Sequence, residues 1–131
     1  MIQEFVDIFM ANKADLETEF KKSHPSYADI VTSVIKLIHD NQGDLYPVPD
    51  PERVHKIDDG HYQGTVVYVI GGTGYQPRDY WYVMVYYGSC SGCDTLEAIR
   101  DYTDEVTDSQ VADYMTLALH ILQGIKAMGD E

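Results

Sequence analysis

Apolar residues along this chain recur first with a helical period, then with a period of two, then with a helical period again. Over residues 2–22 they repeat every three or four positions, which predicts a helix with a weak point at Asn12. Ser26 and Asp29 form a capping-box pattern that predicts the start of a second helix, and residues 41–43 predict its end. Because the intervening link is short, we expect the two helices to be antiparallel neighbours.

The middle of the chain has the composition of strands. Prolines alternate through residues 44–52, so we expect that segment to be an extended connector. Valine and tyrosine are dense in the following residues and predict strands at 53–57, 62–70 and 79–87. The links between these runs are short and contain turn residues, which favours antiparallel pairing.

The third predicted strand divides its side chains between two faces. One face carries the tryptophan and two valines, and the other consists of Tyr80, Tyr82, Met84 and Tyr86. A tyrosine-rich face is typical of a protein-binding platform. Tyrosine is also common in strands that helices cover on both faces, so both interpretations remain open.

The C-terminal part returns to helical patterning. Asp94 with Glu97 predicts a capped helix that runs to about Thr103, and Thr107 with Gln110 opens a last helix whose apolar stripe extends through Ile125. The order α-α-β-β-β-α-α predicts a single α+β domain over residues 1–131. In it, a three-stranded antiparallel sheet is flanked by N-terminal and C-terminal helix pairs.

Acidic residues dominate the charge. The chain has 22 Asp and Glu against 9 Lys and Arg, a net charge of −13, and the excess is largest after Asp94. Phosphate binding depends on Lys and Arg, so we expect neither direct nucleic-acid binding nor attachment to an anionic membrane. The acids either keep the protein soluble or attract a partner with a basic surface.

The apolar runs are short. None approaches the roughly 20 residues that a membrane-spanning helix needs. The first residues lack the basic region of a signal peptide. We therefore expect a cytoplasmic protein. Its cysteines would stay reduced unless they bind a metal or take part in a catalytic cycle.

Cys90 and Cys93 lie three positions apart in a Gly/Ser-rich turn and have three interpretations. They would supply two of the four ligands of a zinc ion, with His55 and His61 as the histidines that would complete a Cys2His2 set. They would act in thiol exchange near a helix start, although the neighbouring Asp94 opposes a thiolate there. They would otherwise be small apolar residues of a sharp turn, which is the interpretation we favour.

The string YGSCSGCDTL at Tyr87–Leu96 is distinctive. With the earlier segments Asp50–Arg53 and His61–Thr65, it resembles a family of small uncharacterised bacteriophage proteins. The resemblance covers about the central third of the chain. It implies a phage or prophage origin, and hence the host cytoplasm, but it implies no activity.

These observations predict a small acidic phage accessory protein that acts by binding. We expect it to be non-enzymatic and to bind a host protein with a basic surface, as anti-defence inhibitors such as anti-CRISPR proteins do. The residues expected to contact the partner are Tyr80, Tyr82, Tyr86, Asp101, Asp104, Glu105 and Asp108. The alternative is a metal-binding or small-ligand protein that uses the Cys90 and Cys93 turn, with zinc as its cofactor. A homodimer is compatible with the sequence.

Overall fold

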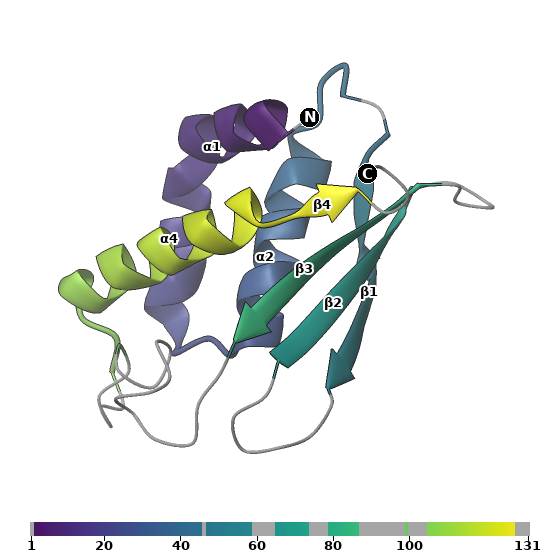
Figure 1. The fold of residues 1–131 in the computed structure, drawn as a ribbon. Coiled ribbons are helices and arrows are strands. Elements are labelled where there is room, and N and C mark those ends of the chain that lie inside the picture. Colours follow the sequence, from purple (N-terminus) through teal and green to yellow (C-terminus); the bar gives the residue numbers. More distant parts are fainter. Residues whose placement is uncertain are drawn as a thin grey trace.

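The computed structural model describes residues 2–45, 47–58, 65–73, 79–86, 99 and 105–127. This part of the chain forms helices on one side and an antiparallel sheet on the other (Figure 1). The α+β class predicted from the sequence is therefore confirmed. The elements follow the order α1 (Ile2–Lys22), α2 (Tyr27–Asp40), β1 (Pro49–Asp58), β2 (Thr65–Gly72), β3 (Tyr80–Tyr86), α4 (Asp108–Gln123) and β4 (Lys126–Ala127).

The weak point predicted in the first helix is present. At Asn12 the backbone of α1 leaves the helical region, with φ −123° and ψ 16°. The Asn12 side-chain amide donates to the carbonyl oxygen of Ile8 at 2.9 Å. Asparagine competes with the helix for backbone partners in this way, so a single residue accounts for the kink in α1.

The capping boxes predicted for α2 and α4 are confirmed, and the one predicted at Asp94 and Glu97 lies outside the described residues. The Ser26 hydroxyl accepts from the Asp29 amide at 3.1 Å, and the Asp29 carboxylate accepts from the Ser26 amide at 3.0 Å. Thr107 and Gln110 make the same reciprocal pair at the start of α4. At the far end of α2, Gly43 has φ +53°, a conformation that glycine adopts without strain.

The C-terminal region differs from the prediction. The last helix ends at Gln123, and Lys126 and Ala127 form β4, which pairs with Tyr82 and Trp81. The prediction of three strands is therefore wrong, because the described sheet has four strands in the order β1-β2-β3-β4. Of the helix predicted over 94–103, only Ile99 is described, and it is helical.

The first strand begins earlier than predicted. Residues of the expected proline connector belong to β1, which starts at Pro49 and pairs antiparallel with β2. Its register shifts between Pro49 and Val54. Proline has no amide hydrogen to donate to a sheet, so it is tolerated at an edge, and β1 is one of the two edge strands of the described sheet.

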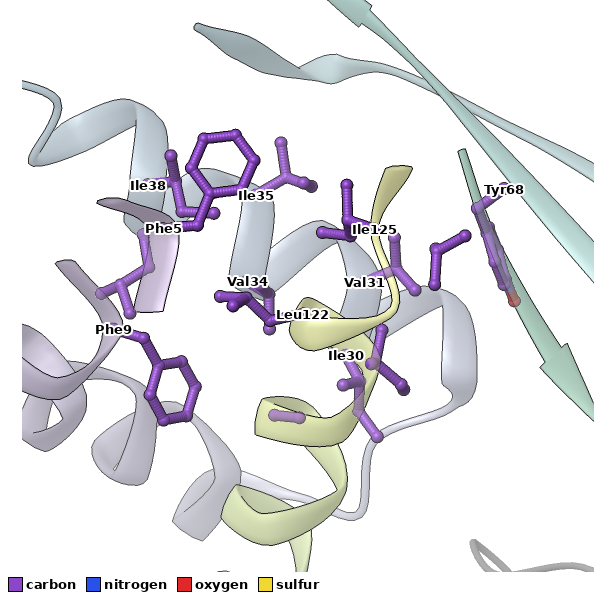
Figure 2. Packing of buried hydrophobic residues seen from close by; sticks show 14 of the residues in the cluster. Phe5, Phe9, Ile30, Val31, Val34, Ile35, Ile38, Tyr68, Leu122 and Ile125 are labelled. Atoms are coloured by element: carbon purple, nitrogen blue, oxygen red, sulfur yellow. The ribbon is translucent and has the colours of Figure 1, made fainter. Parts of the chain in front are cut away.

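One core lies between the helices and the inner face of the sheet. Figure 2 shows side chains of α1, α2 and the end of α4 converging there, with Tyr68 of β2 beside them. The ring of Phe5 on α1 lies 6.3 Å from that of Trp81 on β3. The predicted alternation is confirmed, because the inner face consists of the buried side chains Val66, Tyr68, Ile70, Trp81, Val83 and Val85. In the described part of the chain, no helix has both the length and the apolar character for crossing a membrane.

Candidate functional site

The face of the sheet that points away from the helices is built from the residues that alternate with the buried ones. Residues paired across antiparallel strands share a face, so the register arranges these side chains in rows. One row crosses all four strands and contains His55, Val69, Tyr82 and Lys126. We call this surface the outer sheet face; it consists of Arg53, His55, Ile57, Val67, Val69, Gly71, Tyr80, Tyr82, Met84 and Lys126.

Apolar side chains are unusually accessible on the outer sheet face. Ile57 is 57% exposed, Met84 47% and Tyr80 40%, and Val67 and Val69 between them are half-buried. A single exposed apolar residue is ordinary, whereas a contiguous group of them marks an interaction surface. The described helices all lie on the other side of the sheet (Figure 1). Of the helix predicted over 94–103 only Ile99 is described, so the interpretation in which helices cover both faces remains a prediction.

One corner of the outer sheet face is held by close packing over a glycine. A Cβ atom on Gly71 would lie 3.3 Å from Cβ of Arg53 and 3.4 Å from Cε1 of Tyr80. The Arg53 guanidinium donates to the carbonyl oxygen of Gly72 at 2.6 Å and lies 3.6 Å from the Asp50 carboxylate. Glycine at position 71 thus leaves room for the Arg53 and Tyr80 side chains, which pack close to its backbone from the two neighbouring strands.

The outer sheet face also differs from the rest of the chain in charge. The sequence has 22 acidic residues, yet none occupies an outward position in the regularly paired part of the described strands, which begins at Val54 in β1; Asp50, before the register shift, lies at the corner beside Arg53. The exposed side chains of His55 and Lys126 stand on the first and fourth strands, at opposite ends of one row. Within the described ranges neither has a carboxylate at ion-pair distance. The surface is therefore apolar in its middle and basic at its edges.

The acidic residues predicted to bind a partner lie elsewhere. Asp108 starts α4, where an acid is favourable at a helix N-terminus, and its carboxylate lies 3.3 Å from the Lys21 ammonium. Glu105 is exposed just before it. Both belong to the helical side of the molecule, so the structure does not join them with Tyr80 and Tyr82 in one surface. Asp101 and Asp104 lie outside the described residues.

Two of the predicted sites, Tyr86 and the cysteine turn, lie wholly or partly outside the described residues. Tyr86 pairs with Thr65 at the end of β3, and nothing is described of its side chain. Cys90, Cys93 and His61 lie outside the described residues, so the zinc site remains a prediction. Among the residues that are described, no three His, Cys, Asp or Glu side chains are grouped as metal ligands would be.

A second feature is a polar groove between α1 and α2. It has a volume of about 480 Å³ and is lined in part by Asp15, Glu19, Lys36 and Asp40. The Lys36 ammonium donates to the Asp40 carboxylate at 2.6 Å. This hydrogen bond, helped by a second one from His39, holds the pKa of Asp40 below its usual value, and the same contact raises the pKa of Lys36.

Sequence patterns anticipated part of this geometry. Alternation along β3 identified Tyr80, Tyr82 and Met84 as one face. Ile57 was not assigned to that face, although its pairing with Val67 follows from hairpin alternation. Lys126 was missed because a strand of two residues has no periodicity of its own.

No protein-family model matches this chain, and neither the curated proteins nor the solved structures include a match. The resemblance to a phage family therefore remains a prediction. A function can be inferred only from the geometry of the described residues, above all of the outer sheet face.

Proposed function

We propose that this chain is a non-enzymatic binding protein that docks another protein on its outer sheet face. The observation that carries the proposal is the exposure of Ile57, Tyr80 and Met84 on a sheet face that the described helices leave uncovered. The half-buried side chains of Val67, Val69 and Tyr82 lie between them and join them into one surface. Contiguous apolar surface of this kind marks a protein interface.

The sheet is a suitable scaffold for binding. Side chains on paired strands are already positioned, so a partner loses little conformational freedom of this protein when it docks. Apolar burial contributes about 25 cal/mol per Å². Exposed halves of three large side chains therefore supply on the order of 1 kcal/mol each, which is what a cluster of anchor residues needs.

The biological role that we propose is that of a phage accessory protein acting on a host protein in the host cytoplasm. The resemblance of Tyr87–Leu96 to phage proteins supports the origin, and the small size and acidity fit an anti-defence inhibitor, including the anti-CRISPR class. The net charge of −13 supports a partner with a basic surface, because long-range attraction speeds their encounter.

The test compares two methionines of nearly equal exposure. Met84 on the outer sheet face is 47% exposed and Met10 on α1 is 49% exposed. A tagged protein is used to retain a partner from a bacterial lysate at low salt. We expect Met84→Asp to lower the affinity for that partner at least tenfold, about 1.4 kcal/mol, and Met10→Asp to leave it unchanged.

Equal retention by both variants, with both folded by circular dichroism, would show that the outer sheet face is not the docking surface. Sedimentation of the purified protein tests the homodimer. A dimer that dissociates only in Met84→Asp would identify a second copy as the partner.

A second candidate is supported by the groove between α1 and α2. Of its carboxylates, Glu19 is paired with Lys22 and Asp40 with Lys36, which leaves Asp15 to attract a basic segment of a partner. In that case Asp15→Asn with Glu19→Gln would weaken retention and Met84→Asp would not.

A further inference from the structure

We infer that the outer sheet face takes an acidic, apolar segment of a partner protein, whose carboxylates bind at His55 and Lys126. This inference rests on the proposed function, because it names the chemistry of what docks there. The two cations and the apolar side chains between them are the observations from which it is drawn.

Charge is segregated on this molecule in an unusual way. A chain of net charge −13 places no acid at the outward positions of the regularly paired strands, and the one carboxylate at the corner of the face, Asp50, lies beside Arg53. His55 and Lys126 are exposed on this face without a carboxylate partner in the described residue ranges. Lysine is always a donor, and the imidazole of His55 has an N–H donor in either protonation state. Both groups are therefore ready to donate to carboxylates of a docked segment.

The register sets the spacing of those carboxylates. His55 is on β1 and Lys126 on β4, so three strand-to-strand intervals separate them, roughly 14 Å. An extended segment covers that distance in about four residues, and a helix covers it in between two and three turns. Between the two acids the segment would need apolar side chains that pack on Tyr82 and Val69.

A protein segment fits this face better than a nucleic acid does. Tyr80 and Tyr82 are aromatic, but the charge of the whole chain, −13, repels a polyphosphate, and Ile57 and Met84 offer aliphatic contacts rather than stacking ones. One or two carboxylates meet far less repulsion. The partner would then carry an acidic, apolar segment that docks on this face, surrounded by a basic surface. That basic surface would account for the long-range attraction to this chain of net charge −13.

The test uses short peptides of identical apolar sequence, with two Glu, two Gln or two Lys placed to span the two cations. Binding to the full-length ¹⁵N-labelled protein is followed by NMR at peptide concentrations up to the millimolar range. We expect the Glu peptide to shift the amide signals of Tyr82, Val69 and His55. We expect it to bind about fivefold more tightly than the Gln peptide, the effect of one good exposed ion pair.

Charge reversal supplies the control. In the variant His55→Glu with Lys126→Glu, the preference should change to the Lys peptide. Lys13→Glu reverses an exposed charge on α1 and should leave the preference for the Glu peptide intact.

Each other outcome overturns the inference. The inference of an acidic segment would be wrong if the three peptides bind equally, if the Lys peptide binds more tightly, or if no peptide shifts any signal. Tighter binding of oligothymidylate would identify a nucleic acid instead, and self-association abolished by the charge reversal would identify a second copy. The capture experiment with Met84→Asp is independent of these results. A loss of capture there, together with no preference among peptides, would retain the docking surface and reject only its acidic occupant.

Discussion

Replacing Tyr114 by phenylalanine removes a single hydroxyl from the core side of α4. Tyr114 is fully buried, and its hydroxyl lies 2.6 Å from Nδ1 of His24, in the link between α1 and α2. Its ring also makes edge contacts with Phe20, at a centroid distance of 5.9 Å, and with His24, at 5.8 Å. This one residue thus ties the last described helix to the turn between the first two.

The magnitude follows from what each substitution removes. Phenylalanine keeps both ring contacts and loses the hydrogen bond, which costs about 1 kcal/mol because the half-exposed His24 can turn toward water. Alanine removes the ring as well, and truncating a buried aromatic residue costs about 3–5 kcal/mol. For a domain of this size, 1 kcal/mol corresponds to a fall in Tm of roughly 4 °C.

Urea unfolding followed by circular dichroism measures these losses, with Tyr82→Phe as the control. Tyr82 lies on the outer sheet face with no hydrogen-bond partner among the described residues, so its hydroxyl should contribute less than about 0.5 kcal/mol. A double-mutant cycle of Tyr114→Phe with His24→Ala should give a coupling near 1 kcal/mol. A coupling of zero would refute the structural role of this hydrogen bond.

Two further predictions concern Asp40 and the cysteine turn. The pKa of Asp40 is lowered from 3.8 chiefly by the hydrogen bond from Lys36, so this pair stabilises the fold above that pH. The contribution is lost as pH falls through the lower folded pKa. Asp40→Asn should therefore cost about 0.3–0.5 kcal/mol near neutral pH and nothing in strong acid; an equal difference at both pH values would contradict this assignment. If Cys90 and Cys93 are structural, metal analysis of the purified protein will find no stoichiometric zinc; one equivalent that disappears in Cys90→Ser would establish the metal site instead.

Local signals predicted the helices and the inner face of the sheet well. A capping box depends only on residues three positions apart. The sequence therefore predicted the starts of α2, at Ser26 with Asp29, and of α4, at Thr107 with Gln110. The kink at Asn12 is equally local, since the side chain bonds within its own helix. Alternation along β3 is a property of any strand, and it correctly separated Trp81 from Tyr82.

The candidate site was predicted only in outline. The tyrosines of β3 were recognised, but they were grouped with acids such as Asp108 because sequence gives no way to see that the two lie on different sides of the sheet. The spacing of Cys90 and Cys93 is compatible with a metal site, thiol exchange or a structural turn, and their role remains a prediction.

The sequence by itself determined which segments are helical or extended and which strand positions are apolar, because those properties depend on neighbours along the chain. Tertiary structure alone decided that Lys126 would join the sheet beside Tyr82 and that Pro49 would begin an edge strand. It also decided that the described helices would gather on one face and leave Ile57, Tyr80 and Met84 exposed on the other. These are pairings between segments far apart in the chain, and their free energy comes from burial and register that no local pattern encodes.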